Sequence, residues 1–170
     1  MGVDISAIKL GKYIKREMTN DECLKLEEEL DGNIVHVSCD DFSMNHLSKF
    51  NEGYYEVEDW GDDNDPHIGI SYSSYNDFRN QVCYMANGVQ DSCIWMRPNE
   101  YKGKPFVEMV NFTDCNGSFD YEIAKKLLKD FNDFYVKAKE ELSDWYFSLY
   151  ETYMKILQKC IDYEGIVRYY

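Results

Sequence analysis

Residues 120–160 read DYEIAKKLLKDFNDFYVKAKEELSDWYFSLYETYMKILQKC, and this stretch decides the fold. Apolar side chains recur along it at steps of three and four residues, from Ala124 to Cys160. That spacing predicts helix with one continuously apolar face, because an α-helix completes a turn in about 3.6 residues. We expect Ser118 or Asp120 to cap the N-terminus with a side-chain oxygen.

A single helix over this stretch would be about 60 Å long at 1.5 Å per residue, which is too long for a domain of 170 residues. Two consecutive helices that break near Ser143 and Asp144 avoid that length. The alternative is one rod whose apolar face is covered by a second copy of the chain. The sequence therefore predicts a long C-terminal helical region and leaves a homodimer open.

The rest of the chain mixes strand and helix patterns without regular alternation. Thr19 and Glu22 form a capping-box pattern that opens a short helix, which Asp31-Gly32 ends. Apolar spacing predicts a second helix over 75–86, and short apolar runs predict strands. The expected strands are 3–10, 34–37, 54–57, 67–72, 106–112 and 165–170, with a short helix around 45–50 and loops at 60–66 and 113–117. This mixture predicts one α+β domain over 1–170, with a mixed or antiparallel sheet.

The net charge is concentrated in one segment. The chain has 18 basic and 32 acidic residues, for a formal net charge of −14. Residues 17–67 hold sixteen acids and two bases, whereas 1–16 hold one acid and four bases and 68–170 are close to balanced. Such segregation costs self-repulsion that solubility alone does not require. The segment is a solvated face that keeps an aromatic-rich protein soluble, an anionic surface presented to a basic partner or, as a third alternative, a weak divalent-ion site at 62–67.

An anionic surface of this kind would bind through acids and the aromatic rings that lie among them. The complementary partner is a basic protein surface, such as the groove of a nucleic-acid-binding enzyme or of its nucleoprotein complex. Packing in the core or in a loop is the alternative for each aromatic residue. The candidate partner-binding residues are Tyr54, Tyr55, Glu56, Glu58, Asp59, Trp60, Asp62, Asp63 and Asp65.

Composition and motifs argue against several classes of function. Net acidity disfavours direct binding of nucleic acid, and no apolar run has the length of a membrane span or the setting of a signal peptide. The six cysteines form no C-x-x-C pair, and 62–67 lacks the pattern of a calcium loop, so we expect neither a metal nor a cofactor. No catalytic signature is present. We therefore expect a non-enzymatic protein of the cytoplasm.

A second candidate site lies where the 67–72 strand runs into the 75–86 helix, because a helix N-terminus suits anions. Such a site would make the chain a small-molecule or nucleotide-binding protein, or an enzyme. Its alternative is structural: Ser73 or Ser74 caps the helix, and Arg79 pairs with an acid. The candidate ligand-binding residues are Ser71, Tyr72, Ser74, Tyr75 and Arg79, with Asp114 on the opposite wall.

Several stretches resemble a family of small uncharacterised phage and prophage proteins. They are MGVDISA at 1–7, SYSSYN at 71–76 with Phe78-Arg79, PF at 105–106, NFTDCNG at 111–117, and the terminal GIV at 165–167. The resemblance covers 1–10 and 68–170 and carries over no catalytic residue. It implies origin in a mobile element, whose small acidic proteins often block host defence enzymes. The expectation is therefore an inhibitor in a bacterial host that acts by DNA mimicry, for example against a CRISPR nuclease.

Overall fold

The central strand of the fold is β1 (Gly2–Lys15), which pairs antiparallel with β3 (Gly53–Asp59), β4 (His67–Ser71) and β6 (Ile166–Tyr169). The computed structural model describes residues 2–39, 47–112 and 116–170. Its sheet is antiparallel, with the order β2-β3-β1-β6-β5 and with β4 beside β1, where β2 is Ile34–Val37 and β5 is Gly117–Asp120. The predicted α+β class is confirmed, and the sheet is antiparallel rather than mixed.

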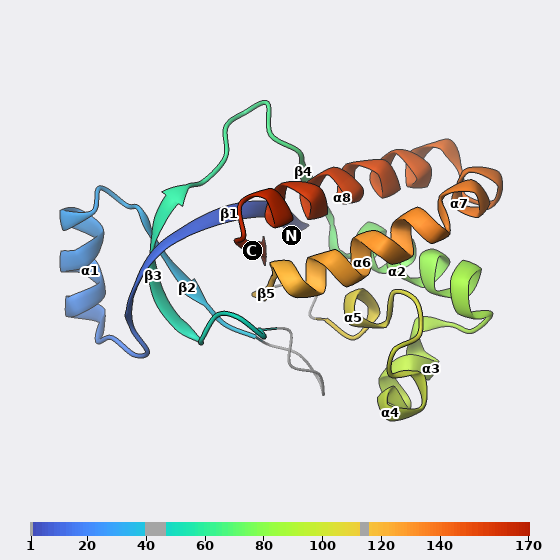
Figure 1. Cartoon of the computed structure of the whole chain (residues 1–170), viewed down its shortest axis with the longest axis horizontal. Coiled ribbons are helices and arrows are strands. Elements are labelled where there is room, and N and C mark those ends of the chain that lie inside the picture. The colour runs from blue at the N-terminus through green and yellow to red at the C-terminus, as the bar shows by residue number, and fades with distance from the viewer. Residues whose placement is uncertain (1, 40–46, 113–115) are drawn as a thin grey trace.

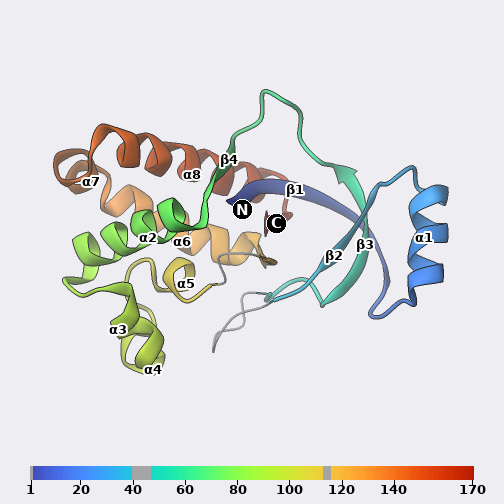
Figure 2. The same cartoon turned by 180° about the vertical axis from the view of Figure 1, so that it is seen from behind.

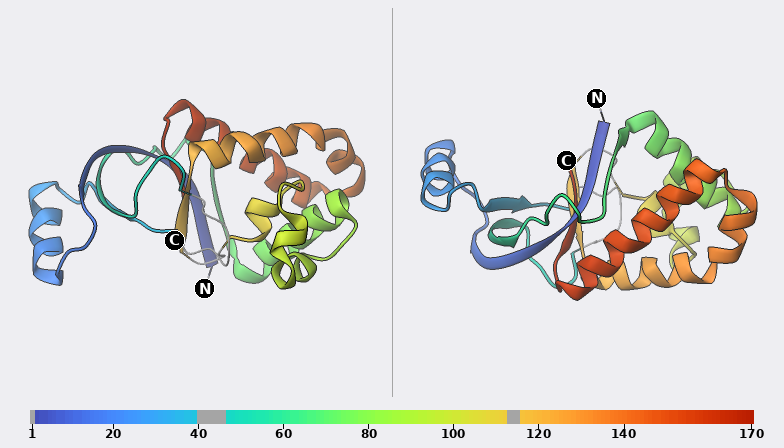
Figure 3. Two further views of the ribbon diagram at one scale, coloured as in Figure 1. Left: turned by 60° about the horizontal axis from the view of Figure 1, so that its bottom comes forward. Right: turned by 90° about the horizontal axis from the view of Figure 1, so that it is seen from above.

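The sheet is curled, so that its two ends approach each other. The N–H of Ser118 in β5 donates to the carbonyl of Ser38, just after β2, at 2.8 Å. A small core fills this curl, and it includes Ile8, Val35 and Ile166. We call β2, β3 and the second half of β1 the arm; it leads away from the helices and ends at α1 (Asn20–Glu29), as Figures 1 and 3 show.

The helices gather on the other side of the molecule (Figure 2). The larger core joins them to β1, β4, β5 and β6, and Phe78, Phe131 and Tyr153 are fully buried in it. The helices of this part are α2 (Tyr72–Asn87), α3 (Asp91–Met96), α4 (Pro98–Tyr101), α5 (Val107–Val110), α6 (Tyr121–Asp133), α7 (Tyr135–Glu141) and α8 (Asp144–Asp162).

The C-terminal helical region folds back on itself. The predicted break is confirmed: α7 ends at Glu141, and Ser143 caps α8 by accepting the N–H of Tyr146. A further break at Phe134 separates α6 from α7. Helices α6 and α8 pack against each other, so their apolar faces cover the same core and the single rod is excluded. Asp120, and not Ser118, is the N-cap of α6.

The prediction of a strand over 106–112 is wrong. Residues 107–110 form the single helical turn α5, entered through Phe106 at φ 62°. Asp130 accepts the N–H of Phe106 at 2.9 Å, and Lys126 pairs with Asp130 at 2.7 Å, which fixes this backbone conformation. All but Glu108 in α5 are buried. A short run buried on every side carries no periodicity that separates strand from helix.

The remaining differences concern short elements. Strand β1 extends to Lys15, beyond the predicted 3–10, and β5 begins at Gly117, where a loop was expected. Residues 47–50 are not helical, and the rest of the helix expected around 45–50 lies outside the described residues. None of the helices in the described ranges has both the length and the apolar character that a membrane crossing needs.

Candidate functional site

The chain leaves the sheet between β3 and β4. Both strands pair with β1 along the same side, with Lys9 opposite Asp59 and Ser6 opposite His67. Residues 60–66 run outward between these two pairings and form the loop that rises from the sheet in Figure 1. We call residues 60–66 the acidic loop. Of the described strands on this side, none supplies a partner for Ala7 or Ile8.

A cleft of about 240 Å³ lies at the base of the acidic loop. It brings together four of the predicted partner-binding residues with residues from β1, β4 and the C-terminus that the sequence did not indicate. The residues that the sequence did not indicate reach the cleft through the pairing of strands that are far apart in the chain, and local sequence patterns do not predict such pairing. The lining residues are Ser6, Ala7, Trp60, Gly61, Asp62, Asp63, Asp65, Pro66, His67 and Tyr170.

The acidic loop and the last residue of β3 before it are both attached to α8 and its C-terminal turn. The hydroxyl of Tyr163 donates to Asp59 Oδ2 at 2.6 Å, and Lys159 forms an ion pair with Asp65. The Tyr163 hydrogen bond is the main cause that lowers the pKa of Asp59. Burial, reinforced by the Asp59 carboxylate, raises the pKa of Tyr163 to about 12. The ammonium group of Lys159 and the hydroxyl of Tyr163, both from the helical part, therefore hold the loop in place.

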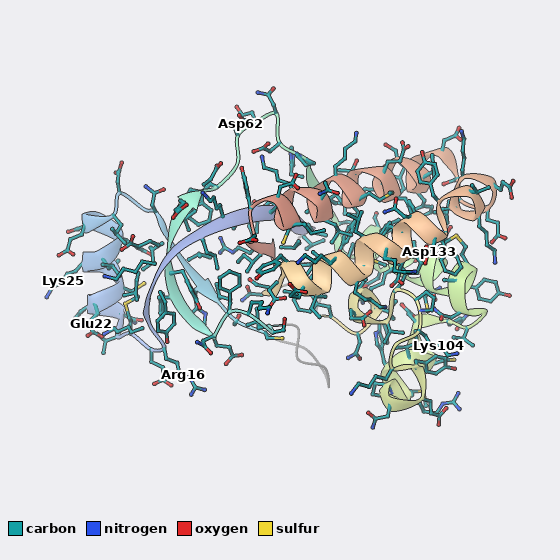
Figure 4. The ribbon with its side chains drawn as sticks, viewed as in Figure 1. Arg16, Glu22, Lys25, Asp62, Lys104 and Asp133 are labelled. Carbon is teal, nitrogen blue, oxygen red and sulfur yellow. The ribbon has the colours of Figure 1, made fainter. Side chains whose placement is uncertain are left out.

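Acidic side chains also organise the backbone of the acidic loop. Asp65 Oδ2 accepts the N–H of Asp62 at 2.7 Å, and Asp62 Oδ1 accepts the N–H of Asn64 at 2.7 Å. Asp62 lies at the outermost part of the loop (Figure 4). Asp63 is exposed and, within the described ranges, makes no side-chain hydrogen bond or ion pair. Asp63 and one oxygen of Asp62 therefore remain available to a partner.

Aromatic rings border the same cleft. Trp60 is 37% exposed and donates its indole N–H to Asn33 Oδ1 at 3.0 Å, and Tyr170 is 50% exposed. The Arg168 guanidinium lies 5.8 Å from the Trp60 ring centre and 4.9 Å from that of Tyr170. Desolvation lowers the pKa of Arg168. The structure thus brings acids and aromatic rings together at one place.

The other predicted partner-binding residues lie along β3 and have local roles. Tyr55 is only 4% exposed, and its hydroxyl bonds to the backbone of Asn51, so it is a core residue. The Tyr54 ring contacts that of His36 at a tilt of 50°, with ring centres 4.6 Å apart. Glu58 forms an ion pair with Lys9 at 2.7 Å. Glu56 is half-buried on the same strand. These four residues are not among those that line the cleft.

A second acidic surface lies at α1, the end of the arm. Thr19 and Glu22 form the predicted capping box, and Lys15 pairs with Glu22 at 2.6 Å. Lys15 is the main cause that lowers the pKa of Glu22 to about 2, with Thr19 as the second. No residue of α1 is buried in the described structure, and Glu27, Glu28 and Glu29 occupy its last turn without a base. Acidic side chains at the C-terminal end of a helix interact unfavourably with the helix dipole.

The residues of the alternative ligand site are largely occupied by structural contacts. Ser71, and not Ser73 or Ser74 as expected, caps α2 by accepting the N–H of Ser74 at 3.1 Å. Tyr75 is fully buried, with its hydroxyl 2.9 Å from that of Tyr169. Tyr72 is half-buried against the core. Asp114 lies outside the described residues, so its part in this prediction has no structural description.

Arg79 is 3% exposed and ties α2 to the chain after α5. It donates to the carbonyl of Phe112 at 2.7 Å and to Asn76 Oδ1 at 2.5 Å, and it lies 5.0 Å from the Trp95 ring centre. Within the described ranges it pairs with no acid, so the acid partner expected for it is not seen. These contacts make Arg79 a packing residue that solvent does not reach.

The described part of the chain contains no cluster of three or more His, Cys, Asp or Glu side chains arranged to hold a metal ion. Comparison of the chain with protein-family models, with curated proteins and with solved structures gave no match.

Proposed function

We propose that this chain is a non-enzymatic acidic protein that binds a basic protein surface of the kind that grips nucleic acid. The observation that carries the proposal is the placement, on two projecting features, of carboxylates that form no ion pair within the described residues. Asp62 and Asp63 lie on the acidic loop, and Glu27, Glu28 and Glu29 lie on α1. Carboxylates that project into solvent can meet cationic side chains with little rearrangement of the chain that carries them.

The basic residues of the N-terminal segment support this proposal, because they do not cancel the acids that project. Lys9 pairs with Glu58, which belongs to β3, and Lys15 pairs with Glu22 in the first turn of α1. The outer acids keep their charge. Long-range attraction of such a surface speeds the encounter with a cationic groove and weakens as salt is added.

A host enzyme that handles nucleic acid, or a defence nuclease such as a CRISPR nuclease, is the target class that fits this proposal. An acidic protein that occupies its groove would exclude DNA by competition. The resemblance to phage and prophage proteins adds an origin in which such an inhibitor is useful. The alternative, a ligand-binding site at the 71–79 junction, has less support because Ser71, Tyr75 and Arg79 are engaged in capping or buried contacts.

The test is competition for DNA. A panel of nucleases and DNA-binding enzymes is loaded with fluorescent duplex DNA, and the full chain is added at about 50 mM and about 200 mM salt. We expect displacement from at least one enzyme, with weaker displacement at the higher salt. The absence of displacement throughout the panel, or displacement that does not depend on salt, contradicts the proposal.

A further inference from the structure

The outer edge of β4 has main-chain groups that pair with no other strand. Asp4 of β1 exchanges both main-chain hydrogen bonds with Tyr170, at 2.9 and 3.1 Å, so the residues on either side of Asp4 direct their main-chain groups toward β4. Their partners Ile68 and Ile70 face β1, and Gly69 between them therefore directs its N–H and C=O away from the sheet. Within the described residues neither group of Gly69 has a hydrogen-bond partner.

The edge at Gly69 is open to solvent. Strand β4 packs mainly against β1, α8 and α2, and α8 packs on β1 as well, so this helix covers a face of the sheet and not the outer edge of β4. Gly69 is exposed, and because glycine has no side chain its exposed surface is that of the main chain itself. No residue of β4 is a lysine or a proline, which often block an edge strand. An extended segment of another protein can therefore pair with this edge.

The carboxylate of Asp4 lies over Gly69 on the solvent face of the sheet. A Cβ atom at Gly69 would lie 2.8 Å from Asp4 Oδ1, and among the described residues it would meet no atom of another side chain within 4 Å. Asp4 is exposed, and its carboxylate forms no ion pair or hydrogen bond within the described residues. A residue that pairs with Gly69 from outside has its Cα about 10 Å from that of Asp4, which is two strand spacings. A lysine or arginine side chain can span this distance, since Gly69 places no side chain in between.

We propose that β4 pairs antiparallel with an extended cationic segment of the partner, in which an arginine or a lysine lies opposite Gly69 and forms an ion pair with Asp4. The inference rests on the proposed function and names the part of the partner that this side of the molecule binds. The main-chain hydrogen bonds to Gly69 supply affinity, and Asp4 selects for the cation. The neighbours of that cation point to the other face, where Ile70 is half-buried, so apolar residues suit those positions.

The experiment titrates the full chain with a short blocked peptide in which arginine alternates with valine. Two further peptides carry an N-methyl group on every arginine or on every valine. In the proposed pairing the arginine N–H groups face β4 and the valine N–H groups face solvent, so only the first modification removes donors to β4. NMR measures binding and the hydrogen exchange of the Gly69 amide.

We expect the unmodified and the N-methylvaline peptides to bind saturably and to slow exchange of the Gly69 amide at least about tenfold. The N-methylarginine peptide should bind at least about tenfold more weakly, and a peptide with glutamate in place of arginine should not bind. Equal affinities of the two methylated peptides, unchanged exchange at Gly69, equal binding of the glutamate peptide, or no binding of the unmodified peptide would overturn the inference.

A variant tests the part of Asp4. Asp4→Asn keeps the size of the side chain and the main-chain hydrogen bonds of β1, and we expect the arginine peptide to bind it at least about threefold more weakly. Glu140→Gln, exposed on α7, loses the same charge far along the chain and is the matched control, whose affinity should not change. Equal affinities of the two variants would contradict the ion pair with Asp4.

The same proteins separate this inference from the proposed function. If the chain displaces DNA from an enzyme but does not bind the arginine peptide, the pairing at β4 is wrong and the proposed function stands. If the peptide pairs with β4 but no enzyme of the panel is recognised, the pairing stands and the proposed function fails.

Discussion

Asp120 is a buried acid that joins the acidic segment to the helical part through hydrogen bonds to Ser48 and Lys49. Its carboxylate is fully buried, caps α6 and accepts the main-chain N–H groups of Ser48 and Lys49 at 2.5 and 2.6 Å. It also accepts the N–H of Glu122 at 3.1 Å. A buried carboxylate is tolerated when hydrogen bonds replace its water, and here four main-chain donors do so, the fourth being the N–H of Ile123 at 3.4 Å.

Replacement of this side chain leaves those donors buried without an acceptor. We expect Asp120→Ala to lower the free energy of unfolding by about 2–4 kcal/mol, since a helix cap and two further charge-assisted hydrogen bonds are lost. Urea unfolding followed by circular dichroism measures the change. The control is Glu140→Ala on the exposed face of α7. We expect its free energy of unfolding to stay within about 0.5 kcal/mol of that of the unmodified chain. Equal changes in the free energy of unfolding of the two variants would show that the hydrogen bonds of Asp120 do not stabilise the fold.

Glu22 is the residue whose ionisation holds the start of α1. The ion pair with Lys15 and the N–H of Thr19 depress its pKa to about 2, from 4.5. A group with a depressed pKa in the folded state stabilises that state above the unfolded pKa. Its contribution is therefore complete above pH 4.5 and is lost as the pH falls toward 2.

We expect the carboxyl carbon of Glu22 to titrate near pH 2, and the helical chemical shifts of α1 to fall across the same range. In Lys15→Gln, both changes should move to higher pH because the main cause of the low pKa is removed. NMR titration of the two proteins measures this. A midpoint near 4.5 in the unmodified chain would contradict the capping-box geometry.

At the scale of elements, the most informative feature is how the C-terminal apolar pattern is used. Its steps of three and four predict helix along 120–160, and Ser143 correctly marks the second break because its side chain caps α8. The break at Phe134 has no such cap and no Gly or Pro, so it follows from packing on the core. The α5 turn was mispredicted for a related reason, since the φ of 62° at Phe106 is accompanied by a tertiary hydrogen bond to Asp130 that local sequence does not indicate.

The candidate site, too, could be predicted from the sequence only in part. The acids and Trp60 are recognisable from charge and composition, whereas Ser6, Ala7 and Tyr170 reach the cleft only through pairing of β1 with β4 and β6. Tyr55 has the alternating pattern of its strand, and the curl of the sheet turns its ring into the core. Local sequence does not specify that curl.

The acidic loop is an element held from outside, and removal of its anchors tests this. In Lys159→Met with Tyr163→Phe, the partners of Asp65 and Asp59 are lost. We expect the amides of Asp62 and Asn64 to exchange about fivefold faster or more, because local opening becomes easier. Hydrogen exchange by NMR measures this, and Lys155→Met, exposed on α8, is the control. Unchanged exchange in the double variant would mean that the loop is held by its own hydrogen bonds.

The junction between α8 and β6 is the second element with a sharp requirement. A Cβ atom at Gly165 would overlap the carbonyl oxygen of Ile8 in β1, a main-chain atom that cannot turn away. We expect Gly165→Ala to lower the free energy of unfolding by about 1–3 kcal/mol, the usual cost of forcing atoms into a packed site. Gly103→Ala, where a Cβ meets nothing within 4 Å but φ is +79°, is a control for backbone strain alone. A loss of less than about 1 kcal/mol at Gly165 would contradict the close approach.

At the scale of the whole molecule, charge and shape coincide. The helices form one end, the arm with α1 forms the other, and the acidic loop rises between them (Figures 1 and 4). Helix α1 makes few contacts with other elements and buries no residue within the described structure, so its role in stability is small. Its acids can therefore be changed without loss of the fold, which makes the interaction proposal testable by substitution.

The most direct test of the central claim compares two variants that lose the same charge at different places. Glu27→Gln, Glu28→Gln and Glu29→Gln are combined with Asp62→Asn and Asp63→Asn in the first. The second replaces five acids of the helical part with the corresponding amides, again Asn for Asp and Gln for Glu. These acids are Asp77, Glu100, Glu140, Glu141 and Asp144. Affinity for an enzyme from which the unmodified chain displaces DNA is measured at about 50 and about 200 mM salt. We predict at least about tenfold weaker binding and a flatter salt dependence for the first variant alone. Equal losses in both variants, or no loss in the first, would contradict the claim that the arm and the acidic loop bind the partner.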